Sequence, residues 1–310
     1  MMNLSPETRL STPSAATIGC FDGVHRGHQM LVQLMVRQAR ERGLRPIAVT
    51  FDRLPRQLFD ATFHPQLLST LEEKTACLKA LGVEEVIVLP FTHELAALSA
   101  EAFMREILRD RLSVALLVTG YDNRFGHDRS EGFDDYVRYG RTLGIDVLRG
   151  DVAMMDNEAA VSSTAIRQLL ADEGRVEAMP DVLTRRYTLS GRVVTGEHIG
   201  HELGFPTANL EPDSSEKLIP ASGAYAVWAM VDGRRMPAMM NIGTRPTFEG
   251  KQQTLEVHIL TAVGNLYGQA MTVEFVGRLR AEQRFDTREA LIAQLEHDRQ
   301  TTEQLLLNNK

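Results

Sequence analysis

A glycine-rich turn between an apolar run and a helical pattern constrains the first half of this chain most strongly. The apolar run covers 15–19, the turn covers 20–28 and reads Cys-Phe-Asp-Gly-Val-His-Arg-Gly-His, and the helical pattern covers 29–42. A strand, a tight turn and a helix N-terminus in succession bring free backbone N–H groups and the positive helix end to the turn. His25 and His28 add side-chain donors, so the sequence predicts a phosphate-binding site here.

Apolar runs alternate with helical patterns through the first half of the chain, which indicates a parallel, doubly wound sheet. We expect strands at 15–19, 46–51, 85–89, 114–119 and 145–148, with helices at 29–42, 69–81, 99–110 and 133–143 between them. If the strand order is 3-2-1-4-5, the first strand and the fourth are neighbours where the order reverses. The turn at 20–28 and the glycine-rich loop at 120–126 then converge there, and such sheets bind ligands at this point.

Glycine-punctuated short strands replace this alternation in the second half, beyond a polar segment at 173–186 that we interpret as a linker. We expect strands at 187–194, 224–231, 235–241, 254–260 and 272–275. Closely spaced strands without intervening helices indicate an antiparallel barrel or sandwich. The chain is expected to close with an amphipathic helix from Asp286, its N-cap, to Leu306, with Leu291, Ile292 and Leu295 buried.

Length and composition limit the class of protein. A chain of 310 residues predicts two domains, and its net charge of −7 argues against nucleic acid as a partner. No apolar run approaches the length of a membrane span, and two cysteines are too few for a disulfide framework or a zinc site. We therefore expect a cytoplasmic enzyme without a membrane or nucleic-acid partner, and leave its oligomeric state open.

Two further segments place polar side chains in patterns that suit phosphate chemistry. Ser162 and Ser163 precede a helical pattern with Arg167 one turn in, and a capped helix start with hydroxyls and an arginine suits phosphate. In the stretch 254–260, apolar and polar residues alternate, so Glu256 and His258 share the face opposite the apolar residues. These two polar residues either face water or belong to a site.

These motifs together resemble those of the bacterial bifunctional riboflavin kinase/FAD synthetase family. The stretch 19–28 is similar to its nucleotidyltransferase signature Gly-x-Phe-Asp-Gly-Val-His-x-Gly-His, and 161–167 resembles its Ile-Ser-Ser-Thr-x-Ile-Arg segment. The resemblance implies that His28 and Arg167 are catalytic. It also implies that ATP binds to Gly19, Phe21, His25, His28, Ser163, Thr164 and Arg167.

The flavin side of this site matches the family less closely. The loop 120–126 resembles Gly-x-Asp-Phe-x-Phe-Gly, but Asn123 stands where an aromatic residue is common. The segment 50–55 resembles Thr-Phe-Asp-Pro-His-Pro, but Leu54 stands at the histidine position, so no role of that histidine is carried over. The resemblance implies flavin contacts at Asp52, Asp122, Phe125 and Arg280.

The second half resembles the riboflavin kinase domain. Its most specific motif is Gly-His-Glu-Leu-Gly-Phe-Pro-Thr-Ala-Asn-Leu at 200–210, and the resemblance implies that Gly204, Thr207 and Asn209 bind ATP. Thr207 and Asn209 would also hold Mg²⁺, which prefers oxygen ligands. The family pattern Leu-Glu-x-His makes Glu256 the general base for the flavin hydroxyl.

The resemblance implies a Rossmann-like FMN adenylyltransferase domain at 1–183 and an antiparallel riboflavin kinase barrel with a C-terminal helix at 184–310. The implied activities are ATP-dependent phosphorylation of riboflavin to FMN, then adenylation of FMN by ATP to FAD with release of pyrophosphate. ATP, riboflavin and FMN are the expected partners, FMN and FAD the products, and Mg²⁺ the cofactor. The alternative is a nucleotidyltransferase for another phosphorylated acceptor, joined to a non-catalytic flavin-binding barrel. Thr207, Asn209 and Glu256 argue against that alternative.

Overall fold

The computed structural model describes residues 1–3, 9–121, 124–127, 130–150, 162–195, 204–247, 250–262 and 264–309. Its contacts divide the chain into two compact units, which we call the α/β unit (Met1–Ser162) and the barrel unit (Ser163–Lys310). The sequence predicted a boundary at 183/184 between the domains that would carry the two activities. This functional boundary stays a prediction.

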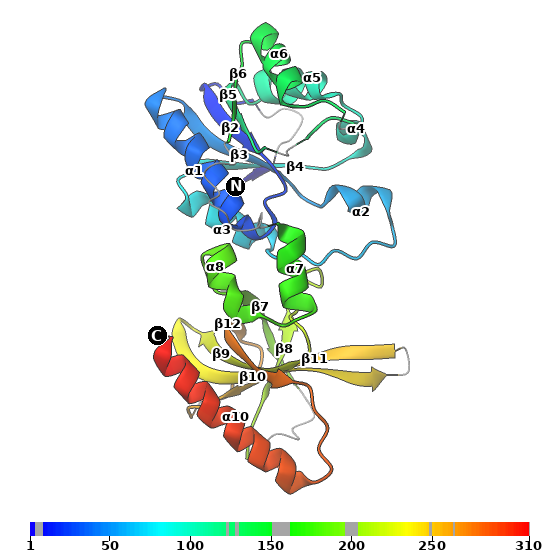
Figure 1. Cartoon of the computed structure of the whole chain (residues 1–310), viewed down its shortest axis with the longest axis vertical. Coiled ribbons are helices and arrows are strands. Elements are labelled where there is room, and N and C mark those ends of the chain that lie inside the picture. The colour runs from blue at the N-terminus through cyan, green and yellow to red at the C-terminus, as the bar shows by residue number, and fades with distance from the viewer. Residues whose placement is uncertain are drawn as a thin grey trace. The chain divides into compact units, whose positions relative to one another are not determined.

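The α/β unit is built on a parallel sheet with the strand order β1-β4-β3-β2-β5-β6 (Figure 1). The order β4-β3-β2-β5-β6 confirms the predicted 3-2-1-4-5 arrangement. The additional edge strand β1 has only two residues, too few to give a recognisable pattern in the sequence. The strands are β1 Met2–Asn3, β2 Ser14–Ile18, β3 Arg45–Phe51, β4 Glu85–Leu89, β5 Val114–Thr119 and β6 Asp146–Arg149.

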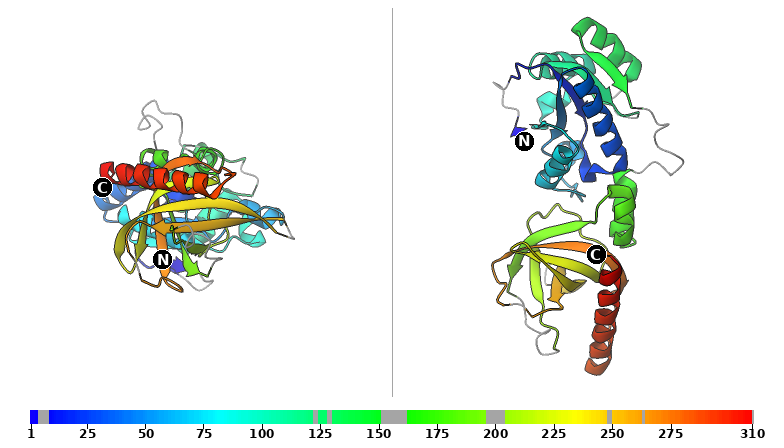
Figure 2. Two further views of the ribbon diagram at one scale, coloured as in Figure 1. Left: turned by 90° about the horizontal axis from the view of Figure 1, so that it is seen from below. Right: turned by 90° about the vertical axis from the view of Figure 1, so that its left-hand side faces the viewer.

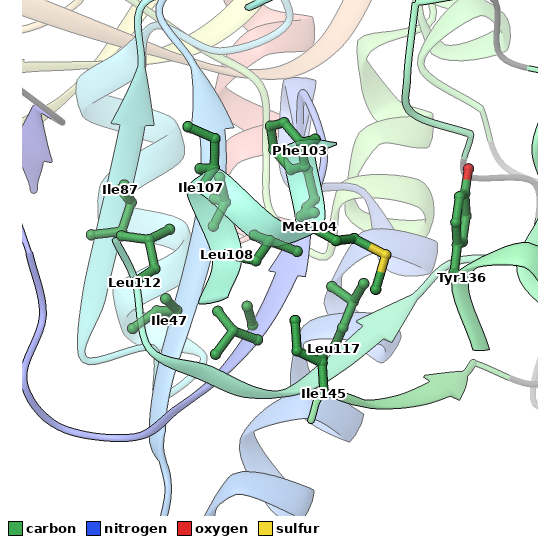
Figure 3. Packing of buried hydrophobic residues seen from close by; sticks show 14 of the residues in the cluster. Ile47, Ile87, Phe103, Met104, Ile107, Leu108, Leu112, Leu117, Tyr136 and Ile145 are labelled. Carbon is green, nitrogen blue, oxygen red and sulfur yellow. The ribbon is translucent and has the colours of Figure 1, made fainter. Parts of the chain in front are cut away.

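Helices cover both faces of this sheet, as a doubly wound fold requires. Successive strand residues alternate between two apolar clusters: Ala15 and Ala48 pack with α1 and α3, whereas Ala16 and Ile47 pack with α5, η2 and α6. Figure 3 shows part of the second cluster, around Ile87, Met104 and Tyr136. The helices are α1 Arg26–Glu41, α2 Pro55–Phe59, α3 Leu71–Ala80, α4 His93–Ala96, α5 Ala100–Phe103, the π-helix η2 Met104–Arg109 and α6 Phe133–Leu143.

The barrel unit begins, in the described stretch 163–183, with three helical segments, of which the sequence pattern revealed only the first. The segment 173–186, expected to be a polar linker, instead contains the 3₁₀-helix η4 Val176–Ala178 and helix α8 Met179–Leu183. Val176, Met179 and Leu183 are buried and share one helical face, and Pro180 is tolerated because it lies in the first turn. The linker prediction was therefore wrong. The helical pattern expected near Ser162 and Ser163 is confirmed as α7 (Ser163–Ala171).

The strands of the barrel unit form a closed antiparallel barrel in the order β10-β11-β8-β7-β12-β9, which confirms the barrel prediction. Strand β8 was missed, because it is short, bounded by prolines and has few apolar residues. The strands are β7 Thr188–Val194, β8 Ala208–Pro212, β9 Gly223–Val231, β10 Arg234–Thr247, β11 Gly250–Ile259 and β12 Ala270–Ala281.

Helix α10 (Arg288–Asn308) lies along the outside of the barrel, against β9, β10 and β12 (Figures 1 and 2). Its N-cap is Thr287, whose hydroxyl accepts the N–H of Ala290 at 3.1 Å, and not Asp286 as predicted. Its fully buried residues are Asp298, Thr302 and Leu306. The predicted residues Leu291, Ile292 and Leu295 are only partly buried.

Candidate active sites

The first candidate site lies at the carboxyl ends of the central strands of the α/β unit. Strand β2 pairs with β3 on one side and with β5 on the other, so the strand order reverses beside it. The turn at 20–28 follows β2 directly, as predicted. Doubly wound sheets bind ligands in this position, so the fold brings the predicted phosphate-binding turn to the expected edge of the sheet.

Buried hydrogen bonds hold the turn in an unusual backbone conformation. Phe21, Gly23 and Val24 all have positive φ, at 49°, 78° and 43°, which is costly for the two residues with side chains. The carboxylate of Asp22 accepts the backbone N–H groups of Leu68 at 2.9 Å and Ser69 at 3.1 Å. Since Asp22 is 5% exposed, its side chain fixes the turn from within and does not face a ligand.

His25 and His28 stack against each other at the N-terminus of α1. Their ring centroids lie 3.7 Å apart at an interplanar angle of 23°, and the ring of Phe21 meets His28 edge-on at 5.3 Å. His25 is the N-cap of α1, because its Nδ1 accepts the backbone N–H of His28 at 3.4 Å. The sequence predicted both histidines at the turn but not their stacking.

The environment of His28 keeps its imidazole neutral. Burial, followed by the nearby charges of His25 and Lys74, lowers the pKa of His28 from 6.5 to about 3. Its Nδ1 is buried and has no hydrogen-bond partner among the described residues. At neutral pH the ring therefore carries one N–H donor, which suits an anionic ligand at a helix N-terminus.

The other predicted residues of the α/β unit have mainly packing contacts. At Gly19, a Cβ atom would lie 3.2 Å from the ring of Phe21, so a side chain at this position would require that ring to shift slightly. The Asp52 carboxylate accepts the N–H of Phe91 at 2.9 Å, and Phe125 stacks on Tyr136 at 4.2 Å. Asp122 and Asn123 lie outside the described residues, as does Val161.

The predicted phosphate contacts Ser163, Thr164 and Arg167 all lie in the first two turns of α7. Helix α7 begins at Ser163, as the sequence predicted, and belongs to the barrel unit by its contacts. The side chain of Thr164 is exposed, whereas Ser163 and Arg167 are partly buried. Their ATP contacts stay predictions.

The second candidate site begins with a pocket of about 310 Å³ at one end of the barrel. Thr207 and Ala208 line it at the start of β8, and Leu266 and Tyr267 line it from the connection before β12. The remaining lining residues are Val193, Pro206, Val257, Ile259, Thr261, Ala262, Gly264 and Asn265. The pocket is therefore mostly apolar, with polar groups next to Thr207, a composition that suits a ligand with a planar apolar part.

The strand register aligns polar residues in one row on the outer face of the barrel. Glu256 on β11 lies directly opposite Asn209 on β8 and Asn241 on β10. Directly opposite residues point to the same face of a sheet. Leu255, Val257 and Ile259 are 4%, 1% and 7% exposed, which confirms that they form the inner face predicted from the alternation.

The row continues across the barrel to Arg280. Ala224 on β9 lies opposite both Asn241 and Arg280. Arg280 donates from Nε to the carboxylate of Asp298 at 2.9 Å, and Gln294 donates to the other oxygen of Asp298 at 2.8 Å. Asp298 and Gln294 belong to α10 and were not predicted. No local pattern in the sequence marks Asp298, because its partner Arg280 lies on a distant strand.

His258 ties the segment before Thr207 to strand β11. Its Nδ1 lies 2.7 Å from the carbonyl oxygen of Pro206, to which it donates, and its ring meets Phe205 edge-on at 5.3 Å. Burial lowers the pKa of His258, while the bond to Pro206 opposes that shift. Gly204 has a φ of 82°, which favours glycine where the chain turns into this segment, and 196–203 lie outside the described residues.

The described residues offer no metal site of the usual carboxylate, imidazole or thiolate kind. No three side chains of His, Cys, Asp or Glu in the described ranges are close enough to share an ion. Among the described residues of the barrel site, Thr207, Asn209 and Glu256 carry oxygen donors, and Asn209 lies directly opposite Glu256. Hydroxyl, amide and carboxylate oxygens fit Mg²⁺, which also takes ligands from water and from bound phosphates.

None of the described helices is both long enough and apolar enough to cross a lipid bilayer.

The chain combines a doubly wound unit, with two histidines in the turn at its switch point, and a closed barrel with a row of polar side chains. Both features suit a transferase that acts on phosphate groups. The comparisons identify the family within this class. The family model described as FAD synthetase matches residues 7–165, and the model described as riboflavin kinase matches residues 183–306. The chain belongs to the family of bifunctional riboflavin kinases/FMN adenylyltransferases.

Individual relatives agree with this assignment. A bifunctional riboflavin kinase/FMN adenylyltransferase of Escherichia coli (strain K12) is 38% identical over 286 residues, 92% of this chain and 90% of the relative. The protein of the same description from Pseudomonas fluorescens is 38% identical over 290 residues, which are 93% of this chain and 91% of that relative. A solved chain described as a macrolide-efflux protein from Streptococcus pneumoniae has a TM-score of 0.89 at 29% identity. The match covers 97% of this chain and 98% of that chain.

Proposed function

We propose that the two reactions take place at the two candidate sites, riboflavin phosphorylation in the barrel unit and FMN adenylation in the α/β unit. The observation that carries this assignment is that each unit has its own polar constellation at a place matched by a different family model. Both reactions occur at a phosphorus centre, so positioning and charge stabilisation contribute most of the catalysis.

At the α/β site the nucleophile is a phosphate oxygen of FMN, which is already ionised at neutral pH. A general base is therefore not needed for this step. The neutral His28 ring and the N-terminal N–H groups of α1 instead donate hydrogen bonds to the phosphates of ATP, where negative charge increases in the transition state. His25 orders the first turn of α1 through its N-cap bond.

At the barrel site the nucleophile is a neutral alcohol, the terminal hydroxyl of riboflavin. Glu256 accepts its proton as the hydroxyl oxygen attacks the γ-phosphorus of ATP, the bond from that phosphorus to the bridging oxygen breaks, and ADP leaves. Asn209 lies opposite Glu256 on the neighbouring strand, so acceptor and phosphate-binding residues are held by the strand register. This arrangement favours a catalytic barrel over the alternative of a non-catalytic flavin-binding module.

The barrel site has oxygen donors for Mg²⁺ at Thr207 and Asn209. Bound there, the ion would neutralise charge on the ATP phosphates. The pocket beside Thr207 has the size and apolar lining for the adenine of ATP. Arg280 stays a predicted flavin contact, and its bond to Asp298 would fix the guanidinium for that role.

The remaining assignments are parts of the same proposal. ATP contacts at Ser163, Thr164 and Arg167 are supported by the start of α7 at Ser163, where helix N–H groups favour anions. Flavin contacts at Asp52 and Phe125 rest on the family resemblance alone. We also propose a cytoplasmic location, since both reactions consume ATP.

The full chain incubated with riboflavin, ATP and Mg²⁺ tests this function. Chromatography should show FMN accumulating first and FAD afterwards, with pyrophosphate released together with FAD. FMN supplied without riboflavin should give FAD directly. A chain that consumes ATP with another phosphorylated acceptor, and leaves riboflavin and FMN unchanged, would contradict the proposal.

A further inference from the structure

Lys74 is a buried lysine beneath the turn of the α/β site. Its side chain is 8% exposed, and its Nζ lies 2.9 Å from the carbonyl oxygen of Cys20, 2.9 Å from Oγ1 of Thr50 and 3.4 Å from the carbonyl oxygen of Phe51. Cys20 is in the turn after β2, whereas Thr50 and Phe51 end β3. One side chain therefore joins the turn to the neighbouring strand.

The contacts require the charged form of this lysine. The hydroxyl of Thr50 donates its own proton to the carbonyl oxygen of Cys20 at 3.2 Å, so it accepts from Lys74. Three acceptors then need three N–H donors, which an ammonium group has and a neutral amine lacks. Burial lowers the pKa of Lys74, while Cys20, Asp22 and Asp52 oppose that shift.

A buried ammonium is a costly way to stabilise a fold. All three hydrogen-bonded acceptors are uncharged, and an apolar side chain of similar volume at a buried position often gives equal or greater stability. Packing alone therefore does not account for a charge here. Its hydrogen bond to Cys20, in the turn that precedes α1, indicates a role in the site.

The residues at the start of α3 also hold the turn, through hydrogen bonds to Asp22. Leu68 and Ser69, just before α3, bind the Asp22 carboxylate, and Thr70 and Glu73 form the capping box that fixes the start of α3. Lys74 donates its backbone N–H to the carbonyl oxygen of Thr70 at 2.9 Å, so its side chain leaves from an ordered first turn. The start of α3 thus anchors both Cys20 and Asp22.

We propose that Lys74 is a positioning residue for FMN adenylation: it holds the turn at 20–28 against the end of β3, so that the turn presents its N–H groups and His28 to the phosphates of ATP. The proposal rests on the assignment of this reaction to the α/β unit. It predicts that substitution of Lys74 lowers kcat/KM for ATP strongly while the melting temperature changes little. Lys74 touches no substrate in this role.

The test compares Lys74→Met with Lys79→Met in the full chain. Lys79 is an exposed lysine on the same helix and serves as the matched control. For Lys74→Met we expect kcat/KM for ATP in adenylation to fall ~10–100-fold, the loss typical of a displaced reacting group. KM for FMN, riboflavin kinase activity and the melting temperature should stay close to those of Lys79→Met.

A second variant covers the case in which Lys74→Met folds poorly. Thr50→Val keeps the shape of the buried side chain and removes one acceptor of Lys74, and it should lower kcat/KM for ATP several-fold with kinase activity unchanged. Lys74→Arg, which keeps the charge, should recover part of the loss.

A fall in kcat/KM for ATP with an unchanged KM for FMN, together with partial recovery in Lys74→Arg, is a readout that a purely structural role would not give. An ATP kcat/KM within threefold of the Lys79→Met control, or equal losses of kinase activity and melting temperature, would overturn the proposal. Absence of adenylation in the unmodified chain would instead contradict the proposed function.

Discussion

The two sites of this chain are held in place by different kinds of interaction. In the α/β unit, two buried polar side chains hold the turn after β2: Asp22, in the turn itself, accepts the N–H of Leu68 just before α3, and Lys74 reaches the turn from α3. In the barrel unit, Asn209 and Glu256 are placed by the backbone ladder of neighbouring strands. Substitutions of supporting side chains should therefore disturb the α/β site more than the barrel site.

The largest effect is expected for Glu256→Gln. Glutamine keeps the size of the side chain but cannot accept the riboflavin proton as a carboxylate does, so FMN formation should fall ~10²–10⁴-fold. Because Glu256 points away from the barrel interior, the free energy of unfolding should change by less than ~0.5 kcal/mol. Assays of FMN formation and denaturant unfolding measure both quantities.

FAD formation from supplied FMN is the internal control for Glu256→Gln. It should continue at the rate of the unmodified chain, since the FMN phosphate needs no base. FMN formation within a few-fold of the unmodified rate, in a folded protein, would exclude Glu256 as the general base.

The corresponding change in the α/β unit is His28→Ala. Removing a donor that stabilises transition-state charge typically costs ~10²–10³ in rate, so FAD synthesis from FMN should fall by this factor. Riboflavin kinase activity should be unchanged. If FAD synthesis stays near the unmodified rate, His28 has only a structural role, and the turn binds phosphate through its backbone.

The supporting residues give the most direct contrast between the two units. Asp22→Asn leaves at least one of the N–H groups of Leu68 and Ser69 with a poorer acceptor, and should lower the free energy of unfolding by ~1–3 kcal/mol. Asn241→Ala removes an exposed side chain from the polar row of the barrel, and should change the free energy of unfolding by less than ~0.5 kcal/mol. Equal losses of stability would contradict the distinction between the sites.

A further effect concerns acid stability. The pKa of His28 is lowered from 6.5 to about 3 in the folded chain, so between these values the unfolded chain binds a proton that the folded chain does not. This contribution to stability is fully present above pH 6.5. It is lost as the pH falls, at up to ~1.4 kcal/mol per pH unit below 6.5.

Urea unfolding of the α/β unit at pH 7 and pH 5 measures this slope. In His28→Ala the slope between the two pH values should be shallower than in the unmodified chain. An identical slope would show that the imidazole is not buried in its neutral form.

Local patterns were sufficient to predict most of the fold. The strand order of the α/β unit followed from the alternation of apolar runs and helices, and the inner face of β11 from its alternating residues. Both depend on residues close in the sequence. Strand β8 escaped notice because prolines bound it and Leu210 is its only fully buried side chain.

The supporting contacts of the sites could not be predicted in this way. Lys74 looks like a surface lysine in a helix until its acceptors Cys20 and Thr50 are placed beside it by the fold. Asp298 is buried only because Arg280, on a distant strand, supplies its partner. Such contacts depend on long-range packing, and hydrophobic periodicity does not encode them.

The central claim is that this chain has two separable active sites, one for each reaction. The most direct measurement is the FAD formed when His28→Ala and Glu256→Gln proteins are mixed with riboflavin, ATP and Mg²⁺. Neither variant alone should form appreciable FAD from riboflavin, whereas the mixture should, because the first supplies FMN and the second adenylates it. A mixture that forms no more FAD than the separate variants would contradict the account.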